Sequence, residues 1–309
     1  MIFSKEEYLS RLAKVKKSMD QKNMDVIILT DPSNMHYLTG YDGWSFYVPQ
    51  GIIMALELNE PIWFGRRQDS KGAKVTTYLQ DKNIIYYPED LIQSPPTHPY
   101  DFVSTFIHEN NWANKNIGVE MDAYYYTAEN HYRLTSTCPN VNFSDATLLV
   151  NWIRLIKSEN EITYMKEGAK LVEAGMKTAY ENIKPRVKQS YVAGKIQNSL
   201  IGGNEEINIG GEYAGLTTIL ASGISASASH LTPKDNLFNN NEGTIIELAG
   251  VKNRYHCPLS RTVYCGKPDS KISDTMKITN EGVEEAISLT KPGNTANDVA
   301  VAFWSVLEK

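Results

Sequence analysis

The pattern of hydrophobic and polar residues in the first half of the chain predicts helices that alternate with strands. Apolar residues recur at helical spacing from Leu9 to Met19, after a capping box formed by Ser4 and Glu7. The mainly apolar run 25–30 is typical of a buried strand, and a polar loop is predicted after it at 31–34. Further strands are predicted at 51–58, 62–65, 83–87 and 116–120, and further helices near 70–80, 100–110 and 123–135. This alternation is typical of an α/β domain, which we place at residues 1–155.

The second half of the chain begins with a long predicted helix and has a strand-rich centre. A linking segment, 145–157, leads to a capping box at Ser158 and Glu161, and the helix that it opens ends before Pro185. A second helix is predicted at 190–200, a glycine-rich loop at 202–211 and a strand at 215–221. Two more helices are predicted at 273–290 and 295–309. Residues 156–309 are therefore expected to form a second domain, of α+β type.

Two strand-like runs in this second domain carry most of the candidate chemistry. β-Branched and aromatic residues dominate Thr244–Val251 and Arg254–Cys265, and a polar corner at Lys252 and Asn253 joins them, so a hairpin is predicted. Glu247 lies between apolar neighbours, where a carboxylate is costly to bury without a partner. Strand alternation in the second run places four polar residues on one face: Arg254, His256, Ser260 and Thr262. Carboxylate, guanidinium, imidazole and hydroxyl groups can therefore converge on one side of a small sheet, which is typical of a functional site.

Composition and charge narrow the class of protein. The chain has 309 residues, 41% of them hydrophobic, and a formal net charge of −5 without a basic run, so nucleic-acid binding is not expected. Its three cysteines lack metal-type spacing and indicate a reducing compartment. The N-terminus lacks the apolar segment of a signal peptide, and the longest apolar run, Ile52–Leu56, is too short to cross a membrane. We therefore expect a cytoplasmic protein that does not bind membranes.

Six segments carry a resemblance to a known family. They are TDPSNM (30–35), LTGYDGWSFYV (38–48), FGRRQD (64–69), GVEMD (118–122), SASHLT (227–232) and RYHCPLSRT (254–262). With the order of elements, they resemble the creatinase and aminopeptidase P family, and within it the ectoine hydrolases, along nearly the whole chain. The resemblance implies an α/β N-terminal domain followed by a pita-bread catalytic domain. It also implies a hydrolase that opens the cyclic amidine ectoine to an N-acetyl-diaminobutyrate.

Two departures from the family pattern bear on the mechanism. In the metallopeptidase branch the hairpin supplies two aspartates to a pair of metal ions, and those positions align here with Glu247 and Pro258. Because proline has no ligand atom, the resemblance falls on the metal-independent branch with creatinase, and we expect neither a metal nor another cofactor. The family's catalytic domain also continues beyond the length of this chain, with its last strands and a further active-site glutamate. We therefore expect a pita-bread domain that is incomplete at its C-terminal end.

Three residues are candidates for catalysis, two of them from the resemblance and one from the chemistry of an amidinium. His230 aligns with the catalytic histidine of the family, and an imidazole is suited to moving a proton near neutral pH. His256 falls where creatinase places a side chain against its substrate. Glu247 is the candidate partner for an amidinium group, which a carboxylate can bind through two charge-assisted hydrogen bonds. A glutamate can equally be the nucleophile or the base that activates water, and the sequence leaves these roles open.

The chemistry of the implied substrate suggests substrate-binding residues, and the resemblance implies a partner. Trp44, Phe46 and Tyr47 are expected to surround the cation with ring faces, and Arg66 or Arg254 to bind its carboxylate. In the family, the first domain of one subunit helps to close the site of the other, so a homodimer with a small-molecule substrate is implied.

Other functions compete with this interpretation. His230, His256 and Glu247 are a plausible ligand set for a single zinc ion, as in a metal-dependent hydrolase or an Xaa-Pro peptidase-like enzyme. A truncated relative that binds its ligand without turnover is the non-enzymatic alternative. His256 can also be an ordinary sheet residue, and Trp44, Phe46 and Tyr47 can be ordinary core aromatics.

Overall fold

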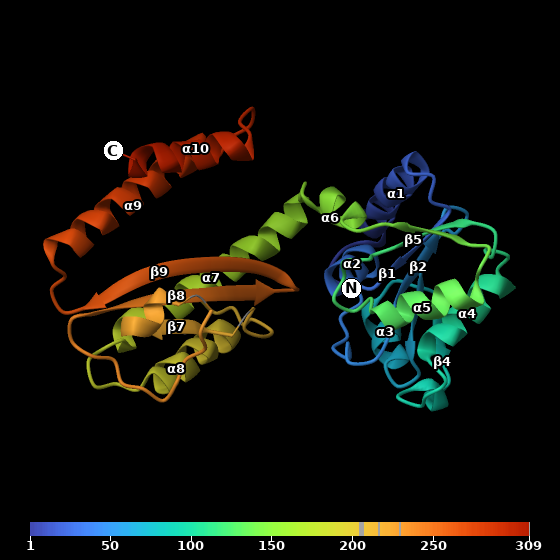
Figure 1. The fold of residues 1–309 in the computed structure, drawn as a ribbon, viewed down its shortest axis with the longest axis horizontal. Coiled ribbons are helices and arrows are strands. Elements are labelled where there is room, and N and C mark those ends of the chain that lie inside the picture. The colour runs from blue at the N-terminus through green and yellow to red at the C-terminus, as the bar shows by residue number, and fades with distance from the viewer. Residues whose placement is uncertain (204–206, 216, 229, 309) are drawn as a thin grey trace. The chain divides into compact units, whose positions relative to one another are not determined.

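A six-stranded mixed sheet forms the centre of the first of two structural units (Figure 1). The computed structural model describes residues 1–203, 207–215, 217–228 and 230–308, and its units are Met1–Ile162 and Thr163–Lys309. The strand order is β4-β3-β2-β1-β5-β6, and only β2 runs antiparallel to its neighbours. The strands are β1 (Val26–Leu29), β2 (Gly51–Ala55), β3 (Ile62–Arg66), β4 (Ile84–Tyr87), β5 (Asn116–Val119) and β6 (Asn142–Asp145).

Helices cover this sheet and bury its apolar strands. They are α1 (Lys5–Gln21), α2 (Pro32–Thr39), α3 (Ser70–Thr76), α4 (Pro99–Glu109), α5 (Ala128–Thr137) and α6 (Leu149–Arg154), with short 3₁₀ turns η1 (Asp81–Asn83) and η2 (Glu89–Leu91). Every residue of β1 and β2 is buried, as expected for strands covered on both faces. Residues of α4 and α5 such as Val103 and Leu134 share one hydrophobic cluster with Ile28 and Ile53 of the sheet.

Two expectations for this unit are wrong in detail. The segment predicted as a polar loop after β1 is the start of α2, because the Asp31 carboxylate caps the helix by accepting the backbone N–H groups of Ser33 and Asn34. The predicted linking segment contains α6, and β6 was not predicted because its sequence, NFSD, is largely polar. Local capping and pairing with β5 thus override the hydrophobic pattern.

A buried carboxylate fixes the end of β5 against the start of α2. Glu120, only 3% exposed, accepts hydrogen bonds from the backbone N–H groups of Thr30 (2.6 Å) and Asp31 (2.9 Å) and from Asn34 Nδ2 (2.5 Å). Asn34 Oδ1 in turn accepts a hydrogen bond from Arg154 Nη1 of α6 at 2.6 Å. Burial raises the pKa of Glu120, and the three donors oppose that effect. The network joins the carboxyl ends of two parallel strands to two helices, which makes this edge of the sheet rigid.

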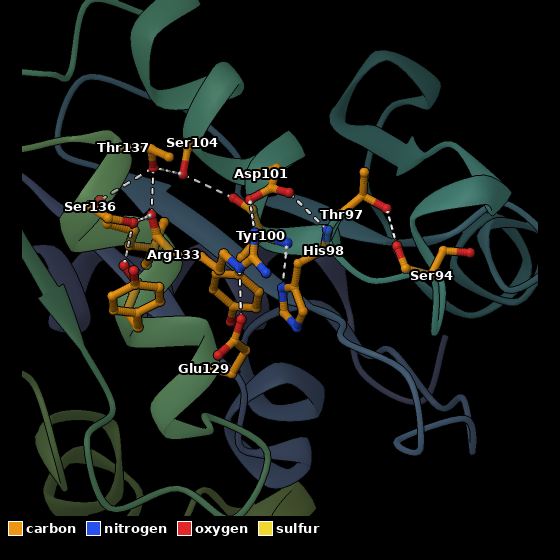
Figure 2. A network of polar contacts seen from close by, with 12 residues as sticks. Ser94, Thr97, His98, Tyr100, Asp101, Ser104, Glu129, Arg133, Ser136 and Thr137 are labelled. Atoms are coloured by element: carbon orange, nitrogen blue, oxygen red, sulfur yellow. Dashed lines mark hydrogen bonds and ion pairs between the residues drawn. The ribbon is translucent and has the colours of Figure 1, made fainter.

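A second polar network links α4 to α5 (Figure 2). His98 caps α4: its Nδ1 accepts the N–H of Tyr100 at 3.1 Å, while the Asp101 carboxylate accepts the N–H of His98 at 2.8 Å. Arg133 of α5 lies between two carboxylates, 3.6 Å from Asp101 and 2.7 Å from Glu129. The histidine can accept the N–H bond only while Nδ1 is unprotonated.

The second unit is built on a three-stranded antiparallel sheet of order β7-β8-β9. Its strands are β7 (Ile219–Ser222), β8 (Glu242–Lys252) and β9 (Tyr255–Cys265), and the 3₁₀ turn η3 (Gly223–Ser227) follows β7. The helices are α7 (Glu159–Asn182), α8 (Gln189–Gly202), α9 (Ser270–Leu289) and α10 (Ala296–Leu307). Apolar residues of α7 and α8, such as Met176 and Ile196, pack with Ile246 and Leu248 of β8 in one cluster. None of the helices, over the residues described, is long and apolar enough to span a membrane.

The predicted hairpin is confirmed. β8 extends beyond its predicted bounds at both ends, and β9 begins one residue later than predicted and ends at the predicted residue. Lys252 pairs with Tyr255, so the turn has two central residues, Asn253 (φ 48°) and Arg254 (φ 64°). Two successive positive φ angles define the type I′ turn, which matches the twist of a hairpin. The strand predicted at 215–221 is wrong at its start, because β7 begins only at Ile219. Residue 216 lies outside the described residues.

Acidification is expected to destabilise the first unit through the His98 cap. Burial, the largest influence, lowers the pKa of His98, so its contribution to stability is complete above the ordinary histidine pKa of about 6.5 and is lost as the pH falls below that value. Loss of the cap costs on the order of 1 kcal/mol. Denaturant unfolding at a series of pH values measures it. His98→Asn, which keeps an acceptor but does not titrate, should lose part of the pH dependence; an unchanged dependence would contradict the assignment.

The effect of replacing Arg254 on the free energy of unfolding is expected to depend more on the backbone conformation at this position than on the lost charge. Arg254→Gly should change the free energy of unfolding by less than about 1 kcal/mol, because relief of the left-handed conformation offsets the greater freedom of glycine in the unfolded chain. Arg254→Val, β-branched at the same φ, should destabilise by roughly 1–3 kcal/mol. Parallel denaturant curves compare the two variants. Equal losses of stability would show that the guanidinium, not the turn, dominates.

Candidate active site

The hairpin presents two of the predicted catalytic residues on one face. Glu247 lies between Ile219 of β7 and Ser260 of β9, and His256 lies opposite Val251. By alternation both residues point away from the face on which Ile246 and Leu248 pack against the helices. Glu247 is half-buried and His256 is exposed, so the carboxylate does not lie inside the apolar core as its neighbours in sequence suggested. We call this side of the hairpin the open face.

Distance along β9 separates the two side chains. Ser260, the partner of Glu247, lies four residues after His256, which corresponds to about 13 Å along the strand. The pair Ala249 and Pro258 occupies the space between them. Glu247 and His256 therefore share a face without touching. Between them, Pro258 is exposed, whereas Ala249 is buried beneath Gly215.

His256 is held in place by its neighbours. Its Nδ1 lies 2.9 Å from the carbonyl oxygen of Arg254, and its ring meets the ring of Tyr213 edge to face with centroids 5.8 Å apart. Gly215 packs so closely on the imidazole that a Cβ there would lie 2.9 Å from Cδ2 of His256. Because a carbonyl oxygen only accepts, the neutral ring carries its proton on Nδ1, and Nε2 keeps a free lone pair.

Cys257 lies on the opposite face of β9. It packs against the hydrophobic cluster of the helices, and burial raises the pKa of its thiol. A thiol with a raised pKa is a weak nucleophile, so the histidine beside it in sequence does not activate it.

His230 lies in a separate segment, after η3. It is exposed and has a left-handed backbone (φ 63°), and Ser229, within the SASHLT motif, lies outside the described residues. Where the chain is described, no hydrogen bond or ion pair joins His230, Glu247 and His256 to one another. The proposed catalytic set is thus divided between the open face, which holds two members, and the loop after η3.

A cavity of about 810 Å³ opens beside this loop. Its lining includes the polar residues Ser222, Ser225, Lys234, Asn239 and Glu242. Asn239 Nδ2 donates to both carboxylate oxygens of Glu242 at 3.2 Å, and a Cβ on Gly223 would lie 2.9 Å from that carboxylate. The described lining includes none of the three predicted catalytic residues, so we do not identify this cavity with the reaction centre.

The predicted aromatic wall lies in the first unit. Trp44 and Tyr47 are 78% and 70% exposed, which makes them surface residues and not core aromatics. Phe46 contacts the edge of Trp44 at 6.4 Å between centroids and packs on Tyr125, from the segment between β5 and α5, at 4.9 Å. Sequence reasoning missed Tyr125, because nothing local to its run of three tyrosines indicates that it meets Phe46.

The two candidate arginines differ in their surroundings. Arg66 donates from Nε to Glu89 at 2.8 Å, and this hydrogen bond raises the pKa of Arg66. A substrate carboxylate would have to compete with Glu89 for it. Arg254 lies at the hairpin turn, where its backbone N–H donates to the Glu212 carboxylate at 3.3 Å. Sequence reasoning also missed Glu212, since a glutamate after a glycine pair gives no local signal of a long-range contact.

The donors on the hairpin do not fit a metal centre. Metal–ligand bonds are about 2.0–2.3 Å long, so their donors must converge on one point, whereas Glu247 and His256 lie about 13 Å apart along the strand. Pro258, between them, offers no donor. Over residues 1–203, 207–215, 217–228 and 230–308, no three His, Cys, Asp or Glu side chains are grouped so that they could hold a metal ion.

Both structural units match known protein families. Residues 11–156 match the creatinase/prolidase N-terminal domain, and residues 163–309 match metallopeptidase family M24. The chain is 41% identical to the ectoine hydrolase of Halomonas elongata over 99% of its own length and 78% of that protein. It is also 41% identical to an uncharacterized hydrolase/peptidase of Sinorhizobium fredii, over 97% of this chain and 76% of that one.

Solved structures show the same fold at low sequence identity. A prolidase from Thermococcus sibiricus matches with a TM-score of 0.83 and 17% identity, over 97% of this chain and 77% of that one. An Xaa-Pro dipeptidase from Bacillus anthracis matches with a TM-score of 0.80 and 17% identity, over the same shares. The expected α/β domain followed by a pita-bread domain is thus confirmed. The chain belongs to the M24 family with a creatinase/prolidase-type N-terminal domain, and it is a hydrolase acting on C–N bonds.

Proposed function

We propose that this hydrolase opens the cyclic amidine ring of ectoine to N-acetyl-L-2,4-diaminobutyrate, without a metal ion, as a cytoplasmic homodimer. The observation that carries the proposal is the open face of the hairpin, where one carboxylate and one oriented imidazole stand on either side of the Ala249–Pro258 pair. The likeness to the ectoine hydrolase of Halomonas elongata supports the choice of substrate. The proposal assigns catalysis to His230, Glu247 and His256.

The geometry suits a small planar cation. Glu247 and His256 lie about 13 Å apart along the strand, so a small ring bound between them would meet the carboxylate on one side and the imidazole on the other. The exposed ring of Pro258 offers an apolar surface for the substrate to pack on, while Gly215 covers Ala249 beside it. Glu247 would bind the two N–H groups of the amidinium as a bidentate charge-assisted pair, or activate the attacking water.

The reaction needs one water and two proton transfers. Water adds to the amidinium carbon and gives one proton to a base. The tetrahedral adduct then collapses: its hydroxyl proton leaves as the carbonyl forms, one ring C–N bond breaks, and the leaving nitrogen takes up both protons to become an ammonium group. His256 Nε2, with its free lone pair, is the proposed proton acceptor, and His230 the proposed donor. The exposed rings of Trp44 and Tyr47 and the half-buried ring of Phe46, with Arg66 or Arg254 for the carboxylate, would complete the pocket in the proposed homodimer.

Turnover of ectoine tests the proposal directly. The purified chain, treated with a chelator, is incubated with ectoine, and proton NMR follows the conversion of the ring methyl signal into an acetyl signal. We expect product to form at the same rate with and without the chelator. An Xaa-Pro dipeptide incubated in parallel tests peptidase activity. Cleavage of the dipeptide but not of ectoine would overturn the proposed substrate, and ectoine-dependent thermal stabilisation without product would indicate a binder.

Substitution of His230 tests its role. His230→Ala should lower turnover by about 100-fold or more, because a positioned acid or base contributes at least that factor, while the melting temperature stays unchanged. His108→Ala, an exposed histidine of the first unit, is the matched control and should keep full activity. Normal turnover by the His230 variant would remove that residue from the mechanism.

A further inference from the structure

The two-residue turn of the hairpin binds a carboxylate of this chain, that of Glu212. The turn residues Asn253 and Arg254, both with positive φ, direct their backbone N–H groups to this one acceptor. The Glu212 carboxylate accepts both N–H groups, at 2.7 Å from Asn253 and 3.3 Å from Arg254. A charged acceptor makes these bonds stronger than those of a neutral one.

The segment that carries Glu212 is attached to the hairpin at three points. Gly215 donates its N–H to the carbonyl of Ala249 at 3.1 Å, and Lys252 Nζ donates to the carbonyl of Gly210 at 3.0 Å. Glu212 lies between these two contacts and joins the tip of the turn to the same segment. Residues 210–215 therefore lie along the hairpin from its tip to Ala249.

This attachment surrounds His256. Tyr213 and Gly215, which follow Glu212 in the sequence, both contact the imidazole ring of His256. The carbonyl oxygen of Arg254 lies against Nδ1 of the same ring. The carbonyl direction depends on the left-handed conformation of Arg254, a strained one for a side chain other than glycine. The Glu212 carboxylate offsets that strain by accepting the N–H groups that the turn exposes.

We propose that Glu212 is a positioning residue that fixes His256 in the Nδ1–H tautomer, with Nε2 aimed at the open face as the basic nitrogen. It does so through the turn: the carboxylate holds Asn253 and Arg254, the Arg254 carbonyl accepts the Nδ1 proton, and Tyr213 and Gly215 hold the ring. The catalytic consequence rests on the function proposed above, whereas the structural effect on His256 does not.

Nitrogen NMR of the histidine ring tests the structural effect. In the full chain labelled with ¹⁵N-histidine, at a pH where the ring is neutral, long-range proton–nitrogen correlations should show His256 with Nδ1 protonated and Nε2 bare. His256→Gln identifies the signals by their loss. In Glu212→Ala the pattern should change to a mixture of tautomers, since an unrestrained ring favours a proton on Nε2. Glu281→Gln, an exposed glutamate of α9, is the control and should keep the wild-type pattern.

Kinetics test the catalytic consequence. Glu212→Ala should lower kcat for ectoine by roughly 10-fold with little change in KM, since a misoriented base affects the reaction more than substrate binding. Glu212→Gln keeps a neutral acceptor, so its kcat should lie between those of the wild type and of Glu212→Ala. If the alanine variant does not fold, the glutamine variant tests the role of Glu212. A wild-type tautomer pattern in the folded Glu212 variants would overturn the proposal. If the wild-type chain hydrolyses no ectoine, the proposed function fails while the NMR result still decides the role of Glu212.

Discussion

The register of the β8–β9 hairpin is the constraint on which the rest of the candidate site depends. Because side chains alternate along a strand, a shift of one residue would move Glu247 and His256 into the apolar cluster and expose Ile246 and Leu248. The two-residue turn at Asn253 and Arg254 fixes that register, and apolar packing on one face favours it. Turn geometry and core packing thus select the same arrangement, and the open face follows from both.

Much of the fold could be predicted from the sequence because its strongest signals are local. Amphipathic spacing gave α1, capping boxes and apolar spacing gave α7, and β-branched runs gave the hairpin. Prediction was wrong where tertiary contacts decide. The polar strand β6 exists because it pairs with β5, and α2 begins early because Asp31 caps it. The start of β7 could not be inferred from composition, because the glycine and threonine residues just before Ile219 do not differ enough from strand residues to mark a boundary.

The candidate site was less predictable than the fold. Strand parity correctly put His256 on one face and Cys257 on the other, because alternation is a local property. The contacts that orient those residues join distant parts of the chain. Glu212 reaches residues 41 and 42 positions later, and Phe46 meets Tyr125 from another loop. No periodicity in the sequence encodes such pairs. The distance between Glu247 and His256 likewise could not be predicted from the residue types alone, because it depends on how β8 and β9 pair.

Together, the hairpin, the Glu212 contact at its turn and the segment 210–215 form a support for one imidazole, on the same face of the hairpin as one carboxylate. The proposed function depends on where a cyclic amidine binds. A crystal structure of the chain with ectoine tests this most directly. We predict the amidine ring at Pro258, between the two side chains, with its nitrogens at Glu247 and its reacting carbon facing His256 Nε2. Ectoine bound in the cavity beside η3, with the open face of the hairpin empty, would contradict it.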